Sequence, residues 1–366
     1  MSRQNAVAVR IGALLLAVAG FAACSEDLPE GAQPPPTSSP TPPGSAQVVV
    51  SHDDDLWLYH AGDDAVRRLT TDGDEAFEQQ PRFHPKTSAV SYFVNDADGT
   101  GGTIFDLDVS SKAATELVST RPVRAIGWSP TGDALAYVAG IDDDEGATVY
   151  LFDPATKVSK EIRSLPTCRG CGRGIADLDE RRVGWSPDGK SILIVDTTLD
   201  NDSLTSMFVL DREGKDVVPP RSGTQARWAP DSRTIYYEQL GASGLPKMKA
   251  LAVATNRQTD IPIQGGVRPA VSPDGRYLAY DDGKAEASLM LFELATGAKR
   301  RLARSVVGPI WLAAGEIAAT EERPCRGDEC GAAPPWFSVG KTVSIELDGS
   351  RRGLSLPSTI DADVAL

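Results

Sequence analysis

The sequence predicts an all-β fold, a β-propeller of four-stranded antiparallel blades. A phrase of the type Trp-Ser-Pro-Asp-Gly recurs along the chain, and its prolines Pro187, Pro230 and Pro273 are spaced by 43 residues. Each copy is followed by an apolar run of strand length and then by a second predicted hairpin, with no helical periodicity between units. Repeats of about 43 residues that each hold two antiparallel hairpins are typical of propeller blades.

The phrase has six copies, and each predicts a tight turn between two strands. They are Arg82–Pro85 (degenerate), Gly127–Gly132, Gly184–Gly189, Arg227–Ser232, Ala270–Gly275 and Ile310–Gly315. Pro fixes φ, Asp can hydrogen-bond to its own backbone, and Gly accepts a positive φ, so Ser-Pro-Asp-Gly favours a turn. The strands expected after four of the turns are 134–138, 192–195, 234–237 and 277–280. The second hairpins are expected to begin with strands 103–108, 148–153, 206–211, 248–253, 289–294 and 343–347.

The two ends of the chain predict how the ring closes. Residues 47–51, 56–59 and 66–69 supply three strands of a further blade but not its innermost strand. The tail Ile360–Leu366 can supply that strand, and completing one blade from both chain ends hides the sheet edges. We therefore expect seven blades, closed by the N- and C-terminal strands. A six-bladed ring with an irregular last unit is the alternative.

Residues 1–23 read as an export signal. They contain Arg3 and Arg10, no acidic residue, and a short apolar run from Ile11 to Ala23. Phe21-Ala22-Ala23-Cys24 resembles a bacterial lipobox, although Phe21 replaces the usual Leu. The resemblance implies that Cys24 is lipidated and anchors the protein to the extracytoplasmic side of a bacterial cell membrane, in the periplasm or at the cell surface. Ordinary secretory cleavage near Ala23 is the alternative.

Residues 24–46 form a predicted linker, and residues 47–366 the propeller. The linker is rich in Pro, Ser, Thr and Gly, and ~22 extended residues would reach at most roughly 70 Å. Removing residues 1–23 changes the net charge from −14 to −16. This acidic balance argues against nucleic-acid binding and against the body lying flat on anionic lipid.

The repeat resembles that of TolB-type propellers over roughly residues 47–357. The resemblance is carried by the Trp-Ser-Pro-Asp-Gly phrase, by the strand Tyr277–Tyr280 and by the later Asp-x-x-Thr-Gly-like turns. Such repeats occur in TolB-like periplasmic proteins and in the propeller domains of prolyl-oligopeptidase-type peptidases. The resemblance implies the fold, and the fold hosts many unrelated roles. No hydrolase domain follows the propeller in this sequence.

Catalytic chemistry is not predicted. Ser186 follows Gly184 but lies in a strand-to-strand turn, whereas a nucleophile elbow needs a strand-to-helix turn and a second Gly. The three histidines, His52, His60 and His84, are expected to have turn and packing roles. We therefore predict no catalytic residue, no cofactor and no firm metal site.

The cysteines other than Cys24 form two close pairs. Cys168 and Cys171 enclose two residues, and Cys325 and Cys330 enclose four. Because an exported chain meets oxidising conditions, we expect two local disulfides. A zinc site made by the four thiols is the alternative.

Both cysteine pairs lie in insertions that the blade topology assigns to one face, opposite the Ser-Pro turns. Long loops in compact domains are often functional. The candidate ligand-face residues are basic or aromatic: Arg169, Arg173, Arg181, Arg182, Arg323, Arg326, Trp336 and Phe337. Acidic runs on the same face, with Asp96, Asp98, Asp142, Asp144 and Asp196, are weak calcium candidates. Solvated loops are the alternative for both sets.

These observations favour a membrane-anchored, monomeric, non-catalytic binding or scaffold protein of the cell envelope. The long-loop face is expected to hold an envelope protein or a glycan. The alternatives are an enzyme with a site in the central channel and a module that binds envelope polysaccharide.

Overall fold

The computed structural model describes most of the predicted propeller. The described residues are 46–53, 55–71, 78–140, 146–165, 181–196, 206–240, 246–284, 286–323, 338–357 and 362–365. The chain divides into two units, Met1–Ser38 and Ser39–Leu366, and all described residues belong to the second. The export signal, Cys24 and nearly all of the linker lie outside the described residues.

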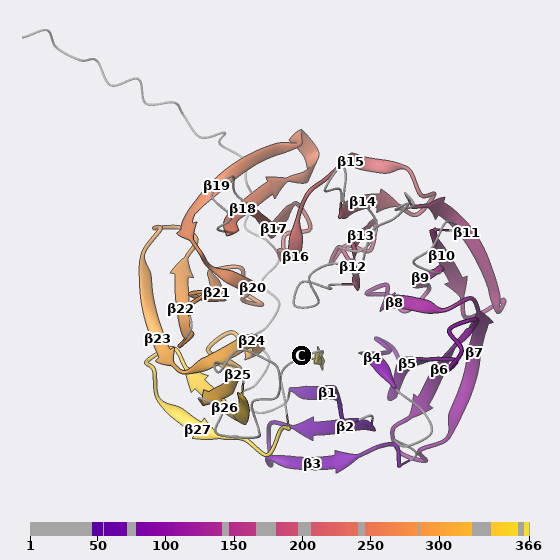
Figure 1. Ribbon diagram of the computed structural model, residues 1–366, viewed down its shortest axis with the longest axis horizontal. Coiled ribbons are helices and arrows are strands. Elements are labelled where there is room, and N and C mark those ends of the chain that lie inside the picture. The colour runs from indigo at the N-terminus through magenta and orange to yellow at the C-terminus, as the bar shows by residue number, and fades with distance from the viewer. Residues whose placement is uncertain are drawn as a thin grey trace, which may run out of the picture. The chain divides into compact units, whose positions relative to one another are not determined.

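Seven four-stranded antiparallel sheets form a ring of blades (Figure 1). From the innermost strand outward, blade 1 consists of β28 (Asp363–Ala365), β1 (Gln47–His52), β2 (Asp55–His60) and β3 (Ala65–Arg68). Blade 2 consists of β4 (Gln79–Phe83), β5 (Ala89–Asn95), β6 (Gly102–Asp108) and β7 (Ala114–Thr120). Blade 3 consists of β8 (Val123–Trp128), β9 (Leu135–Gly140), β10 (Ala147–Asp153) and β11 (Val158–Ser164).

The remaining four blades follow the same order. Blade 4 has β12 (Arg181–Trp185), β13 (Ser191–Asp196), β14 (Met207–Asp211) and β15 (Asp216–Arg221). Blade 5 has β16 (Thr224–Trp228), β17 (Thr234–Leu240), β18 (Pro246–Ala252) and β19 (Arg257–Gln264), with a 3₁₀ turn at Val253–Thr255. Blade 6 has β20 (Val267–Val271), β21 (Tyr277–Asp281), β22 (Ser288–Glu293) and β23 (Lys299–Arg304). Blade 7 has β24 (Val306–Ala313), β25 (Glu316–Arg323), β26 (Ser338–Glu346) and β27 (Arg351–Gly353).

The ring is closed by strands from both ends of the chain. β28 pairs with β1 in antiparallel register, with Val364 opposite Val48 and Asp363 opposite Val49. The Asp363 carboxylate also accepts a 2.9 Å hydrogen bond from the backbone N–H of Phe83 in blade 2. The predicted seven blades and their closure are thus confirmed, and the six-bladed alternative is wrong.

Apolar packing between neighbouring blades forms the core. Seven clusters of buried side chains fill the seven interfaces between adjacent blades. In β13, Ile192 and Ile194 pack toward blade 3, whereas Leu193 and Val195 pack toward blade 5. Since successive side chains of a strand point to opposite faces, both faces of this sheet are buried, and its second strand is continuously apolar.

The repeated phrase joins the strands within a blade and joins one blade to the next. The Ser186 hydroxyl is 1% exposed; it donates to Asp188 at 2.7 Å and accepts from the Ser191 N–H at 2.9 Å. Gly189 adopts a φ of +69°, which favours glycine there. The indole N–H of Trp185 donates to the Gly127 carbonyl of the preceding blade at 2.9 Å, and that of Trp311 donates likewise to Ala270 at 3.0 Å.

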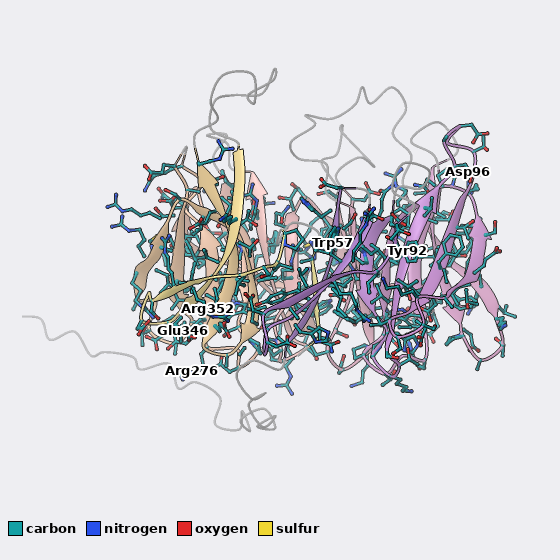
Figure 2. The ribbon with its side chains drawn as sticks, turned by 90° about the horizontal axis from the view of Figure 1, so that it is seen from below. Trp57, Tyr92, Asp96, Arg276, Glu346 and Arg352 are labelled. Atoms are coloured by element: carbon teal, nitrogen blue, oxygen red, sulfur yellow. The ribbon has the colours of Figure 1, made fainter. Side chains whose placement is uncertain are left out.

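The propeller has two faces of different character. In blades 2–7 the innermost strand ends at a copy of the repeated turn, so these turns and those between third and fourth strands lie on one face, the turn face. The connections between second and third strands and between blades lie on the other, the loop face. Figure 2 shows Asp96, which follows β5, and Arg276, which follows a Ser-Pro turn, on opposite faces of the ring. In the described part of the chain, no helix has the length and apolar character needed to cross a membrane.

We expect the closing strand to stabilise the whole ring. Deleting residues 362–366 would expose the inner edge of β1 and remove Ala362 and Val364 from their apolar cluster. We predict a loss of roughly 2 kcal/mol or more in the free energy of unfolding, as for the loss of a buried aliphatic side chain. Chemical denaturation measures it. Deleting Leu366 alone keeps the β1–β28 pairs and is the control; equal stability of the two truncated chains would contradict closure by β28.

Candidate functional site

The two predicted insertions both connect strand ends on the loop face. One runs from Leu165, after β11, to Arg181 at the start of β12, and the other runs from Arg323 at the end of β25 to Ser338 at the start of β26. The candidate residues within them lie outside the described residues, as do both cysteine pairs: Arg169, Arg173, Arg326, Trp336, Phe337, Cys168, Cys171, Cys325 and Cys330. Their predicted roles stay predictions.

Three candidate arginines are described at the strand ends that flank these connections. Arg181 and Arg182 are the first residues of β12, opposite Asp196 and Val195 of β13. Arg323 is the last residue of β25 and is exposed. These arginines therefore belong to strand ends on the loop face rather than to the loops themselves.

The described acidic candidates are engaged in local hydrogen bonds. Asp98 accepts from both the N–H (3.0 Å) and the hydroxyl (2.7 Å) of Thr100, and these bonds lower the pKa of its carboxyl. The backbone of Asp96 pairs with Gly99 and Gly101 in the same turn. Asp142 and Asp144 lie outside the described residues. Among the residues that are described, no group of three His, Cys, Asp or Glu side chains could hold a metal ion.

Asp196 is not the exposed loop residue that the sequence predicts. It is 2% exposed, and its carboxylate accepts from Nε and Nη2 of Arg124 in blade 3 at 2.8 and 3.0 Å. Arg124 is itself 3% exposed. The two groups are buried as a bidentate ion pair between blades, an arrangement that satisfies both charges away from water.

Polar residues at the ends of second strands join adjacent blades at the mouth, which is the set of loop-face ends of the innermost strands. The hydroxyl of Ser51 donates to the Glu78 carbonyl at 2.6 Å, and Asn95 bonds both the N–H and the carbonyl of Val123 at 2.7 and 2.9 Å. Glu238 accepts from the Arg268 N–H at 2.6 Å. Each contact crosses from one blade to the start of the innermost strand of the next blade. It therefore fixes the position of that strand relative to the preceding blade.

The innermost strands bulge at this mouth. Gln80, Gln225 and Arg268 have φ values of +47°, +51° and +54° in β4, β16 and β20, and Gly308 has +65° in β24. The strand register shifts at each of these positions. Long side chains rarely adopt a positive φ, so the surrounding contacts hold these bulges in place. No signal in the sequence predicts them.

Asp281, the last residue of β21, is a buried carboxyl beside the loop-face ends of β20 and β24. Its side chain is 0% exposed; it accepts from Nη1 of Arg268 at 2.8 Å and from the Gly308 N–H at 3.1 Å, while Oδ1 is buried with no hydrogen-bond partner in the described structure. Burial, with a smaller contribution from Glu322, raises the pKa of Asp281 to about 6, against the opposing effects of Arg268 and Gly308. Burial also raises the pKa of Glu322.

The predicted packing and turn roles of the histidines agree with the structure at His84. Its ring lies 4.2 Å from that of Trp128, and its Nδ1 accepts from the Lys86 N–H at 3.2 Å. Burial lowers the pKa of His84. The imidazole therefore completes the degenerate first turn.

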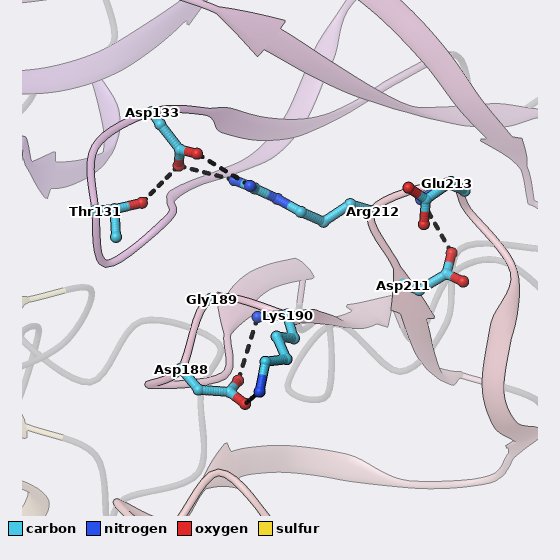
Figure 3. A pocket seen from close by; sticks show the side chains of 8 residues that line it. All are labelled: Thr131, Asp133, Asp188, Gly189, Lys190, Asp211, Arg212 and Glu213. Atoms are coloured by element: carbon cyan, nitrogen blue, oxygen red, sulfur yellow. Dashed lines mark hydrogen bonds and ion pairs between the residues drawn. The ribbon is translucent and has the colours of Figure 1, made fainter.

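A polar pocket of about 360 Å³ opens on the turn face between blades 3 and 4 (Figure 3). Arg212 crosses it, donating to Asp133 at 3.0 and 2.8 Å and lying 5.0 Å from the ring of Trp185. Asp188 pairs with Lys190 at 3.1 Å. These contacts make the pocket a junction between turns of neighbouring blades.

Comparisons with known proteins show the fold. No family model matches the chain, and no curated protein matches it. The propeller domain of the Trilobed protease from Pyrococcus furiosus aligns with a TM-score of 0.56 at 11% identity over 88% of this chain and 96% of that one. Acylaminoacyl peptidase from Pyrococcus horikoshii aligns with a TM-score of 0.51 at 14% identity, over 79% of this chain but 47% of the peptidase.

TolB structures are also among the matches. TolB from Acinetobacter baumannii aligns with a TM-score of 0.49 at 14% identity over 72% of this chain, which spans 64% of the length of that protein. The seven blades and the matches with a TM-score above 0.5 show a β-propeller fold. At these identities, the likeness concerns the fold and not the activity.

We predict that Asp281 makes stability depend on pH. Its pKa is higher in the folded protein than the usual 3.8. The stabilisation by its protonated form is therefore fully present below about pH 4 and is lost as the pH rises through 6. Between pH 4 and 7, the free energy of unfolding should fall by about 2 kcal/mol less for Asp281→Asn than for the wild type. Urea denaturation across this range measures the difference.

Asp282→Asn is the matched control. Although burial opposes it, hydrogen bonds from Lys284 and Ser288 lower the pKa of Asp282, so its stabilisation is lost as the pH falls. That variant should change the pH profile in the opposite direction. Superimposable profiles of wild type and Asp281→Asn would contradict the prediction.

Proposed function

We propose that this protein is a lipid-anchored, extracytoplasmic binding propeller that is not an enzyme and presents its loop face to a protein or glycan of the bacterial envelope. The observation that carries the proposal is the position of the two longest connections of the propeller. Both start and end on the loop face, at Leu165 and Arg181 and at Arg323 and Ser338. Long connections on a rigid scaffold are where binding residues concentrate.

The buried serines of the repeated turns have a structural role, and this supports a binding role for the long connections. The serines of three Ser-Pro turns, Ser129, Ser186 and Ser272, are at most 1% exposed. Each donates to an aspartate of its own turn. Their hydroxyls stabilise the turns, so the regular part of the chain acts as scaffold and leaves recognition to the irregular connections.

The composition of these connections defines the class of partner. Arg169 and Arg173 lie in one and Arg326, Trp336 and Phe337 in the other, on a chain whose net charge is −14. Guanidinium groups with nearby aromatic rings suit a partner that presents carboxylate or phosphate groups beside apolar or sugar surfaces. An acidic envelope protein fits this chemistry, and so does an anionic glycan.

The anchor rests on the N-terminal sequence. The lipobox-like segment ending at Cys24 and the Pro-rich residues 24–46 support an acylated, tethered protein. The Pyrococcus horikoshii peptidase is 14% identical and is matched over 47% of its length, so its activity is not carried over to this chain.

Replacing Cys24 tests the anchor. We expect Cys24→Ser to lose metabolically incorporated fatty acid and to leave the membrane fraction, because the thiol that carries the lipid is gone. Cys168→Ser/Cys171→Ser is the control and should stay acylated. A Cys24→Ser protein that still carries lipid would contradict the proposal, and mature wild type beginning near Ala23 without lipid would favour ordinary secretion.

Charge reversal on the loop face tests the binding role. The full-length protein is cross-linked in its native envelope and purified with its partners, which mass spectrometry identifies. Arg169→Glu/Arg173→Glu should lose at least one partner by tenfold or more, as expected when a charged contact is reversed. Lys190→Glu/Arg276→Glu makes the same charge change on two Ser-Pro turns of the turn face and should retain it. Equal recovery from both variants would contradict the loop-face assignment.

A further inference from the structure

Arginine is concentrated on the outer edge of three neighbouring blades. The outermost strands β23, β27 and β3 contain no Asp or Glu, whereas each of the other four outermost strands contains at least one. Blades 6, 7 and 1, which carry these strands, are adjacent in the ring (Figure 1). We define the arginine rim as six exposed residues of these strands: Arg300, Arg301, Arg304, Arg351, Arg352 and Arg67.

Most of these guanidinium groups form no ion pair in the described structure. Arg300 has an acidic neighbour, since hydrogen bonds from Ser350 and attraction from Arg300 lower the pKa of the Asp348 carboxyl. In the described structure, Arg352 forms an ion pair with Glu316 at 3.3 Å, and the other rim arginines form none. The guanidinium of Arg351 donates to the Arg304 carbonyl at 2.8 Å, which holds the edges of blades 6 and 7 together without neutralising either charge. The rim therefore presents guanidinium groups to solvent on a chain whose net charge is −14.

Protection of sheet edges does not account for the rim. Charged side chains on outermost strands prevent edge-to-edge pairing, and charges of either sign serve that purpose. β11, with Lys160, Glu161 and Arg163, and β19, with Arg257 and Asp260, are protected by mixed charges. Positive charges on three neighbouring strands repel one another. An anionic partner would offset this repulsion.

We propose that the arginine rim docks on the phosphate groups of an anionic phospholipid bilayer, with blade 7 toward the membrane. The inference rests on the proposed function, because the lipid anchor brings the propeller to the bilayer. Arginine binds phosphate through two parallel hydrogen bonds and keeps its charge at any relevant pH. The propeller would then stand on its edge, with neither the loop face nor the turn face covered by lipid.

Screening reconciles this docking with the acidic net charge of the chain. At physiological salt the potential of a charged surface decays over about 8 Å, so only residues close to the lipid are attracted or repelled. The acidic residues of blades 2–5 lie outside that distance when blade 7 faces the membrane, whereas Glu346 and Asp348 of blade 7 lie beside the rim and offset part of its charge. The local charge of the rim, rather than the charge of the whole chain, then decides the interaction.

The curvature of the ring permits all three strands to take part. Four strands spaced by about 4.8 Å place the outermost strand ~14 Å beyond the innermost one, and roughly 20 Å from the ring axis. With seven blades, the edges of blades 6 and 1 then lie only ~7 Å farther than that of blade 7 from a plane touching blade 7, within the screening distance of about 8 Å. Extended arginine side chains shorten the difference.

The entry point of the chain favours the same orientation. The propeller begins at Gln47 of β1, in blade 1, next to blade 7. A tether of ~22 residues holds the body at an effective concentration of the order of millimolar at the bilayer. At that concentration a weak contact suffices, since each Lys or Arg near an anionic surface strengthens binding ~fivefold.

The height of the propeller above a bilayer tests the proposal. The full-length lipidated protein is reconstituted into supported bilayers of phosphatidylcholine, with or without 30% phosphatidylglycerol, and neutron reflectometry measures the protein layer. We expect the layer to contact the headgroups of the anionic bilayer within about 8 Å. It should be separated from the neutral bilayer by a gap of up to roughly 70 Å, the reach of the linker, and 0.5 M NaCl should restore that gap on the anionic bilayer.

Two triple variants of equal charge change separate the rim from net charge. Arg300→Glu/Arg301→Glu/Arg304→Glu should open the gap on the anionic bilayer. Lys160→Glu/Lys215→Glu/Arg257→Glu should leave contact intact; these exposed residues lie on the outermost strands of blades 3 and 5 and in the turn before the outermost strand of blade 4. If the first variant melts early, Arg67→Glu/Arg351→Glu replaces it on different strands. Equal heights on the two bilayers, or equal effects of the two triple variants, would overturn the proposal.

The failure of docking and the failure of anchoring give different results. A protein that stays on the neutral bilayer after washing but keeps its gap on the anionic one retains the anchor and lacks rim docking. A protein that washes off the neutral bilayer but is held by the anionic one until salt is raised lacks the anchor and retains rim docking.

Discussion

The burial of both faces of every blade is the constraint on which the rest of this structure depends. Each sheet packs one apolar face on the preceding blade and the other on the following blade, as Ile194 and Leu193 do from a single strand. A row of such sheets would leave an apolar face exposed at each end. A closed ring has no ends, and β28 completes it by pairing with β1 across the junction of the two chain termini. Apolar burial is the main stabilising term in folding, so closure by this short strand matters to every blade.

The same constraint explains why the most conspicuous residues of the sequence have structural roles. Trp185 and Trp311 use their indole N–H groups to bond the backbone of the preceding blade. The buried serines of three turns, Ser129, Ser186 and Ser272, bond an aspartate of their own turn. Regular spacing of these residues follows from the regular spacing of the blades. Residues that interrupt the pattern are therefore better candidates for recognition than residues that repeat it.

Polar groups inside the ring fix the positions of neighbouring blades relative to one another. Asn95 and Glu238 bond the beginning of the next innermost strand, and the buried Arg124–Asp196 pair joins blades 3 and 4. An apolar contact would tolerate small shifts between blades, whereas a bidentate ion pair fixes their relative position. These contacts give the loop face a rigid base. The arginine rim lies on the outside of the ring, so binding of lipid there and binding of a partner on the loop face can occur together.

The sequence by itself predicted the strands and the turns, since apolar runs of strand length and Ser-Pro-Asp-Gly turns are local patterns. The repeat period of 43 residues and the incomplete N-terminal blade then favoured seven blades and a closing C-terminal strand. Tertiary structure decided what depends on distant residues. Asp196 lies 72 residues from Arg124, and its partner could not be inferred from its acidic neighbours in the sequence. The bulges at Gln80 and Arg268, and the buried carboxyl of Asp281, likewise follow from contacts between blades. The arginine rim joins Arg67 to Arg300 and Arg351, which only closure of the ring brings to one edge.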